Sequence, residues 1–99
     1  MVYNKIENIS KIENALSQIY NISILDINSR IKKEEIVEIR MIIWYICHKY
    51  LDISSVKLGK YYKRDHSTIL NGIKKMENKE DIIGFMYSKI KEIFPEIFD

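Results

Sequence analysis

The sequence predicts an all-α fold, a domain of five or six helices built around a helix-turn-helix. Apolar residues recur at three- and four-residue steps over most of the 99 residues, a spacing that places side chains on one face of a helix. Glycine and proline are scarce, at three and one, which disfavours a turn-rich β fold. Near the middle, a short helical segment, a turn of about three residues and a second helical segment follow one another, which is the order of a helix-turn-helix.

The first half of the chain is predicted to contain two long helices. Isoleucine and leucine at helical spacing indicate a first helix over about 4–20. The stretch NISILDINS, residues 21–29, is expected to be a connector ending in a loop or a single helical turn, followed by a basic loop over 30–33. The next helix, over about 34–51, is apolar almost all round, so we expect it to be central and buried. Its aromatic residues are expected in the core: Trp44, Tyr45 and Tyr50.

The second half predicts three further helices, over 55–62, from 66 to about 78, and over 80–94. Asp52 or Ser54 can cap the first of them and Asp65 the second, because short polar side chains accept hydrogen bonds from free helical amides. Gly59 would let these two helices approach closely. The last helix is expected to stop before Pro95, since proline disfavours a helical conformation in the preceding residue.

Composition limits the kind of protein. The chain is long enough for one domain, 1–99, with an ordinary soluble balance of 46% apolar and 30% charged residues. The single cysteine, Cys47, excludes an internal disulfide and suits a reducing compartment. The first ten residues lack the apolar segment of a secretion signal, and the longest apolar run, 41–47, is too short to span a bilayer. We therefore expect a cytoplasmic protein without a membrane partner.

Charge is unevenly distributed along the chain. The net charge is only +2, yet residues 57–75 carry six cations and one acid, Asp65. Residues 1–56 are balanced, and residues 76–99 carry an excess of three acids. A concentrated basic segment suggests a polyanionic partner. The alternative is a solvated helix face whose lysines serve solubility.

The basic segment coincides with the second helix of the predicted helix-turn-helix. Its buried face is expected to be formed by Ile69, Leu70, Ile73 and Met76. Polar residues lie opposite on the helical wheel: Ser67, Asn71, Lys74 and Lys75. The first turn of such a helix is the part that enters a major groove of DNA, and short polar side chains there can reach base edges.

The stretch IVEIRMIIWYICHKYLDISSVKLGKYYKRDHSTILNGIKKM, residues 36–76, resembles the C-terminal DNA-binding domain of DnaA, the bacterial chromosomal replication initiator. The signature of that family is an I/L-G pair, an aromatic residue, a short turn, RDH[ST]T, an aliphatic pair and a basic tail. The matching residues here are Leu58-Gly59, Tyr61, the turn at Tyr62-Lys63, Arg64-Asp65-His66-Ser67-Thr68, Ile69-Leu70 and Lys74-Lys75. The similarity covers about 11–79 and leaves 80–99 as a C-terminal helix.

The resemblance implies double-stranded DNA as the partner and a role for each matching residue. Base contact in the major groove falls on Asp65, His66 and Ser67. Minor-groove contact falls on the basic loop, where Lys32 stands at the position of the family's arginine and Arg30 precedes it. Phosphate contacts fall on Arg40, His48 and Thr68, and Lys63, Arg64 and Lys74 are expected to join them as cations of the same basic segment. The chemistry agrees, because a carboxylate can accept from the cytosine amino group and histidine or serine can bond to base edges.

Two of these residues also have structural interpretations. His66 falls near the buried side of the helical wheel and could instead pack on Tyr61 or Tyr62. Asp65 could be a helix cap alone, although one carboxylate oxygen can cap while the other faces a groove.

The chain departs from the family's pattern at several positions. Met41 replaces a glutamine, which removes a polar contact to the DNA backbone. The turn that usually holds two glycines is Tyr62-Lys63, so one of these residues would adopt a positive φ at some cost. Glu34 and Glu35 follow the basic loop and would repel phosphates if they faced DNA. No G-x-x-x-x-G-K-[ST] phosphate loop occurs, so we expect neither ATPase activity nor a bound nucleotide.

Catalytic and metal sites are not expected. Cys47, His48 and His66 are too few and wrongly spaced for zinc. Asp65, His66 and Ser67 are sequence neighbours that point outward from one helical turn, whereas a catalytic triad needs side chains that converge. We therefore expect no enzyme, no metal and no cofactor.

A protein-interaction module with the same fold is the competing hypothesis. In that case DNA binding has decayed, and the amphipathic outer helices dock a partner such as the replication machinery. Met41 and the Glu34-Glu35 pair favour this alternative.

Overall fold

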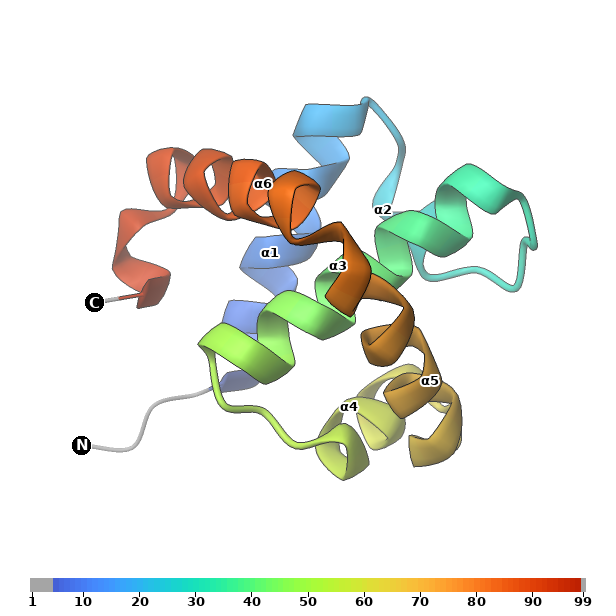
Figure 1. Ribbon diagram of the computed structural model, residues 1–99. Helices are drawn as coiled ribbons and strands as arrows, with labels where there is room; N and C mark the ends of the chain where they lie inside the picture. Colours follow the sequence, from blue (N-terminus) through green and yellow to red (C-terminus); the bar gives the residue numbers. More distant parts are fainter. Residues whose placement is uncertain (1–4, 99) are drawn as a thin grey trace.

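The computed structural model describes residues 5–98 and confirms the predicted all-α fold (Figure 1). Its elements, in chain order, are α1 Lys5–Tyr20, α2 Ile24–Ile27, α3 Glu34–Tyr50, α4 Ser55–Tyr62, α5 His66–Met76, the 3-10 turn η1 Glu77–Lys79, α6 Glu80–Ile93 and the 3-10 turn η2 Pro95–Phe98. The expected start of the first helix at residue 4 lies outside the described residues. Among those described, no helix is long and apolar enough to cross a membrane.

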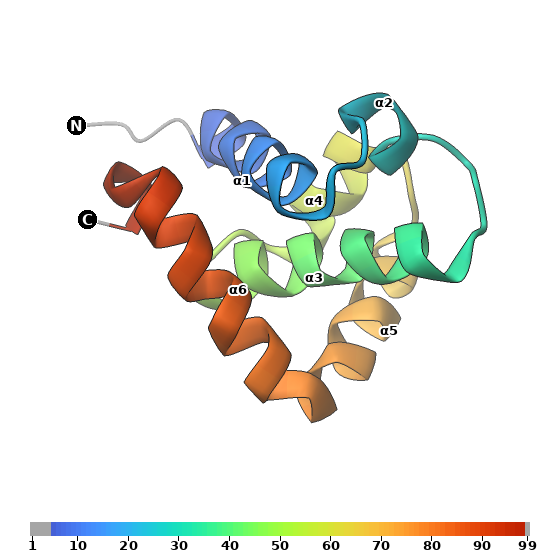
Figure 2. The ribbon, with the colours of Figure 1, turned by 90° about the horizontal axis from the view of Figure 1, so that it is seen from above.

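Helix α3 is the central element of the fold. Figure 2 shows α1 and α2 on one side of it and α5 and α6 on the other. Its fully buried residues are Ile39, Ile42, Ile43, Ile46 and Cys47. Trp44 and Tyr45 also lie in the core, as expected, with 4% of each side chain exposed. The expectation was wrong for Tyr50, which is 37% exposed and stacks on Tyr87 of α6 with 4.0 Å between ring centroids.

Helix boundaries follow local chemistry. Ser54 caps α4, because its Oγ accepts a hydrogen bond from the Lys57 amide at 3.1 Å. Helix α5 ends at Met76, about two residues earlier than expected, because the turn η1 redirects the chain into α6. Helix α6 ends one residue earlier than expected, because Phe94 has φ −132° and ψ 72°, a non-helical conformation of the kind that the following Pro95 requires.

Gly59 lies where α4 and α5 cross most closely. A Cβ atom at this position would lie 2.6 Å from the Arg64 carbonyl oxygen and 3.4 Å from the His66 amide nitrogen. The first distance is shorter than side chains tolerate and involves backbone, which cannot move without opening the turn. The expected close approach is therefore confirmed. Gly84 in α6 is different, because a Cβ there would meet nothing within 4 Å.

These two glycines make a matched pair for a stability test. Gly59→Ala is expected to destabilise the fold by about 1–3 kcal/mol, because the added methyl overpacks a rigid contact. Gly84→Ala is expected to stabilise it by about 0.5–1 kcal/mol, because alanine has the better helix propensity and the site is open. Urea denaturation of both variants measures the difference, and shifts of the same sign would contradict the packing at Gly59.

Candidate nucleic-acid interface

The turn between α4 and α5 is held in a left-handed conformation. Lys63 has φ 56° and ψ 47°, so it is the residue that adopts the positive φ where glycine would be less strained. The Arg64 amide donates to the Gly59 carbonyl at 2.8 Å, which closes the end of α4. The turn therefore brings Arg64 and Asp65 to the surface directly before α5 begins.

Asp65 occupies the N-cap position of α5, but its side chain makes no capping hydrogen bond. Its backbone conformation is extended, with φ −62° and ψ 143°, and its carbonyl accepts from the amides of Thr68 and Ile69 at 3.0 and 3.2 Å. The expectation that its carboxylate would cap the helix was therefore wrong. The carboxylate is exposed beside the equally exposed His66, Ser67 and Thr68.

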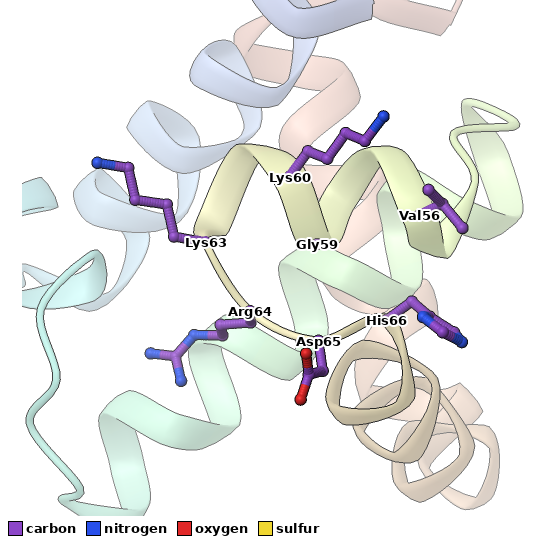
Figure 3. Close-up of a pocket in the computed structure, with 7 residues that line it drawn as sticks. All are labelled: Val56, Gly59, Lys60, Lys63, Arg64, Asp65 and His66. Carbon is purple, nitrogen blue, oxygen red and sulfur yellow. The ribbon is translucent and has the colours of Figure 1, made fainter.

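His66 does not fill the inward position that the helical wheel suggested. Its ring is exposed and lines a hollow of about 380 Å³ between α4 and the start of α5, shared with Lys60, Lys63, Arg64 and Asp65. Figure 3 shows the side chains of Arg64 and His66 pointing in opposite directions from the turn, with Asp65 between them. A row of diverging polar groups is suited to contact a surface rather than to enclose a small molecule.

The two tyrosines before the turn point inward to Glu13 of α1. The Tyr62 hydroxyl donates to Oε2 of Glu13 at 2.7 Å, and the Tyr61 hydroxyl donates to Oε1 at 3.5 Å. Glu13 is 3% exposed. Burial raises the pKa of its carboxyl, and hydrogen bonds from Tyr62, Asn28 and Tyr61 only partly oppose this effect. The end of α4 is thus anchored to α1 through a buried polar cluster.

The basic loop before α3 lies beside the turn of the helix-turn-helix and α5. Nη2 of Arg30 donates to the Lys63 carbonyl at 3.4 Å, which links the loop to the turn of the helix-turn-helix. Arg30 and Lys32 line a groove of about 370 Å³ together with residues of the turn and α5: Arg64, Thr68, Asn71, Gly72 and Lys75. The basic loop and the basic helix α5, for which contacts with the minor and the major groove of DNA were predicted separately, therefore lie on one surface of the protein.

Asn71 and Lys75 were not among the predicted contact residues, although both are exposed in this groove. The signal for them was present, because Thr68, Asn71 and Lys75 follow one another at three- and four-residue steps and so share one face of a helix.

The surface formed by the loop, the turn and α5 is electropositive. Partial burial and the nearby Arg30 lower the pKa of the Arg64 guanidinium. The guanidinium also lies 5.9 Å from the centroid of the Trp44 ring. The four ion pairs found within residues 5–98 all lie elsewhere, at Lys11–Glu96, Lys49–Glu80, Lys79–Glu38 and Lys89–Glu92. Because no ion pair compensates these cations, the surface is a favourable site for an anion.

The remaining predicted phosphate contacts have different surroundings. Lys74 is exposed on α5 but lines neither of these two hollows. His48 lies in a third hollow with the acidic Glu77 and Glu80, and its Nδ1 is 3.0 Å from the Ile53 carbonyl oxygen. Arg40 is buried beneath the basic loop with 5% of its side chain exposed, and only its edge lines the groove.

The departures from the family's pattern also have structural outcomes. Met41 is half-buried and packs against the core, so it adds an apolar patch to the wall of the groove. Glu34 and Glu35 are exposed in the first turn of α3. Burial raises the pKa of the Tyr20 phenol on α1, and the nearby carboxylates of Glu38 and Glu35 add to this effect.

The fold and this polar, basic surface define a helix-turn-helix domain of the DNA-binding kind. The chain belongs to the helix-turn-helix family of the bacterial DnaA protein, whose model matches residues 9–76. The match confirms the resemblance found over residues 11–79.

Three relatives illustrate the similarity. The chromosomal replication initiator protein DnaA of Desulfotalea psychrophila is 33% identical over 91 residues, covering 85% of this chain and 19% of that protein. DnaA 1 of Chlamydia muridarum is 35% identical over 72 residues, covering 73% and 16%, respectively. DnaA of a Thermoanaerobacter species is 30% identical over 82 residues, covering 83% and 18%. The chain thus spans less than a fifth of the length of these relatives.

The pKa of Glu13 gives a prediction for the anchor of α4. Because the folded pKa is raised above the ordinary value of 4.5, the native state binds the proton more tightly. Stabilisation from this group is full below the unfolded pKa and is lost as the pH rises through the folded pKa. Glu13→Gln has no such loss, so the melting temperature of the variant should rise relative to wild type between pH 4 and pH 7. A constant difference across this range would show that Glu13 does not titrate as proposed.

Proposed function

We propose that this domain binds double-stranded DNA sequence-specifically, at a short site similar to the DnaA box. The observation that carries the proposal is the start of α5, where Asp65, His66 and Ser67 are exposed without capping or packing roles, beside uncompensated arginines and lysines. Unpartnered polar groups at the first turn of a second helix suit base edges in a major groove.

In this mechanism α5 enters the major groove with its first turn. Asp65 accepts a hydrogen bond from a cytosine amino group, and His66 and Ser67 bond to neighbouring base edges. The side chains of Asp65 and His66 point in different directions in Figure 3, which supports contact with successive bases rather than with one. Phosphates on either side are held by His48, Lys63, Arg64, Thr68 and Lys74, and Arg40 adds to them only the small part of its side chain that is exposed. Asn71 and Lys75 are additional candidates, because they line the same groove as Arg64 and Thr68.

The basic loop reaches the adjacent minor groove through Arg30 and Lys32. Narrow A·T-rich minor grooves concentrate negative potential and attract inserted cations. The loop and α5 border the same groove of the protein. The loop can therefore contact the minor groove of a duplex while α5 contacts the neighbouring major groove. The proposal includes no nucleotide, no cofactor and no catalysis, and places residues 1–99 as one unit in a bacterial cytoplasm, whether encoded by a bacterium, a phage or a mobile element.

A protein partner is the second candidate function. Several large apolar side chains are exposed on α2 and α6, among them Leu25 at 84%, Phe85 at 56% and Ile82 at 44%. Such residues on outer helices could dock a component of the replication machinery. If this were the function and DNA binding had decayed, affinity for duplex DNA would be weak and independent of sequence.

Salt titrations test the division of roles. Lys63 and Lys74 should act through charge alone, so removing either should weaken binding to specific and random duplexes alike and reduce the salt slope by about 0.9. Lys63→Gly is the sharper variant, because it also relieves the left-handed strain at this position and should raise stability by about 1 kcal/mol. Weaker binding by a more stable protein cannot be attributed to unfolding. Lys91→Ala on α6 is the matched control and should change neither slope nor affinity.

His66→Ala and Ser67→Ala should behave in the opposite way. Each should cost about 1–3 kcal/mol on the preferred site, little on random DNA, and leave the salt slope nearly unchanged. For Asp65 the fair substitution is asparagine, which keeps the shape of the side chain but removes its charge and replaces one of its two acceptor oxygens by an amide donor. Equal losses on both duplexes, or no loss on either, would make these residues structural.

The basic loop gives a separate prediction. Replacing Arg30 and Lys32 together with alanine should weaken binding and remove a preference for A·T pairs beside the core site. Selections from random DNA, run with wild type and with the double variant, compare the two flank profiles directly. If the profiles coincide, the loop does not enter a minor groove.

A further inference from the structure

Arg40 is buried, and its guanidinium donates to backbone carbonyls rather than pairing with a carboxylate. Its Nε donates to the Ile27 carbonyl at 2.6 Å, Nη1 to the Ile31 carbonyl at 2.8 Å, and Nη2 to the Ser29 carbonyl at 2.5 Å. Longer contacts of 3.4 Å join Nη2 to the Asp26 carbonyl and to Oγ of Ser29. All three nitrogens of the guanidinium are therefore used within the segment 26–31, which forms the end of α2 and the start of the basic loop.

These carbonyls have a reason to need such a donor. They belong to the end of a helix of only four residues and to the loop after it, and the carbonyls at a helix end lack intrahelical partners. A guanidinium offers five donors in a planar fork and can satisfy several acceptors at once. Arg40 projects from α3, which also packs on α5 through Trp44 and Gly72, where an added Cβ would lie 2.7 Å from the indole. The loop and the recognition helix are thus positioned on the same rigid element.

We propose that Arg40 is a positioning residue that fixes the basic loop on α3 and thereby sets the preference for bases flanking the core site. The inference rests on the proposed DNA-binding function. Arg30 and Lys32 depend on this placement, because Arg40 holds the carbonyls of Ser29 and Ile31 on either side of Arg30, whereas the contact of Arg30 itself with the Lys63 carbonyl is longer, at 3.4 Å. Arg40 itself is too deeply buried to serve mainly as a point charge for phosphate.

Arg40→Lys separates positioning from charge. Lysine keeps the positive charge but cannot span the carbonyls that the guanidinium fork holds. In selections from random DNA, the variant should keep the core preference set by the start of α5 and lose the A·T preference in the flank. The double substitution of Arg30 and Lys32 should weaken wild-type binding by about tenfold, but weaken Arg40→Lys by less than about twofold, because coupled residues are not additive.

A second measurement needs no DNA. The loop contains three sites for trypsin, at Arg30, Lys32 and Lys33, and native-state cleavage reports local opening. Arg40→Lys should be cut faster in this loop than wild type, at a temperature where circular dichroism shows both proteins folded. Ser29→Ala is the companion variant should Arg40→Lys fold poorly, because it removes the three contacts of Oγ, with Arg40, the Asp26 carbonyl and the Ile31 amide, and leaves α3 and its charge intact. It should show the same changes to a smaller extent.

The outcomes distinguish the two levels of the proposal. An Arg40→Lys protein with wild-type flank profile and wild-type cleavage would overturn the positioning role. So would an Arg40→Met protein that only loses affinity evenly, with a salt slope reduced by about 0.9, because that result describes a phosphate contact. If wild type shows no sequence preference at all, the proposed function fails, and faster cleavage of Arg40→Lys alone would still establish Arg40 as the residue that holds the loop.

Discussion

The close approach of α4 and α5 at Gly59 is the constraint on which the interface depends. Because the two backbones meet there, the chain must reverse within three residues, and Lys63 takes the left-handed conformation that allows it. The reversal leaves Asp65 at the N-cap position without a capping bond. The close contact of Gly59 with the backbone before α5 therefore determines which side chains are exposed at the start of α5. Adding one methyl group at Gly59 would remove this contact.

Helix α3 contacts both the basic loop and α5 and so places them on one continuous surface. On one side its isoleucines fill the core, and on the other Trp44 packs under Gly72 of α5 and Arg64 of the turn. One helical turn earlier, Arg40 fastens the loop. Since a single rigid helix carries both contacts, the spacing between the loop and α5 is fixed before any ligand binds. Preorganisation of this kind reduces the entropy lost on association.

Most of the fold could be predicted from the sequence, because helical periodicity, caps and Pro95 act locally. The short helix over 55–62 and the stop before proline follow from such signals. Apart from the expected Asp65 cap and the end of α5, the failures involve contacts between distant segments. The helical wheel placed His66 near the core, but it could not anticipate that Glu13 would draw Tyr61 and Tyr62 inward. Likewise, no pattern in the sequence indicated that Arg40 would donate to carbonyls nine to fourteen residues before it.

The distribution of ion pairs explains how a chain with a net charge of only +2 can present a strongly basic face. Lys49 and Lys79 lie outside that face and are paired with Glu80 and Glu38 at 3.9 and 3.1 Å. Exposed pairs of this kind contribute little to stability, but they neutralise cations where a polyanion would otherwise bind in a wrong orientation. The cations of the loop, the turn and α5 take part in no ion pair found within residues 5–98. A field concentrated on one side orients the approach of a polyanion, so the pairing of Lys49 with Glu80 and of Lys79 with Glu38 favours one orientation of approach even though it contributes little to folding.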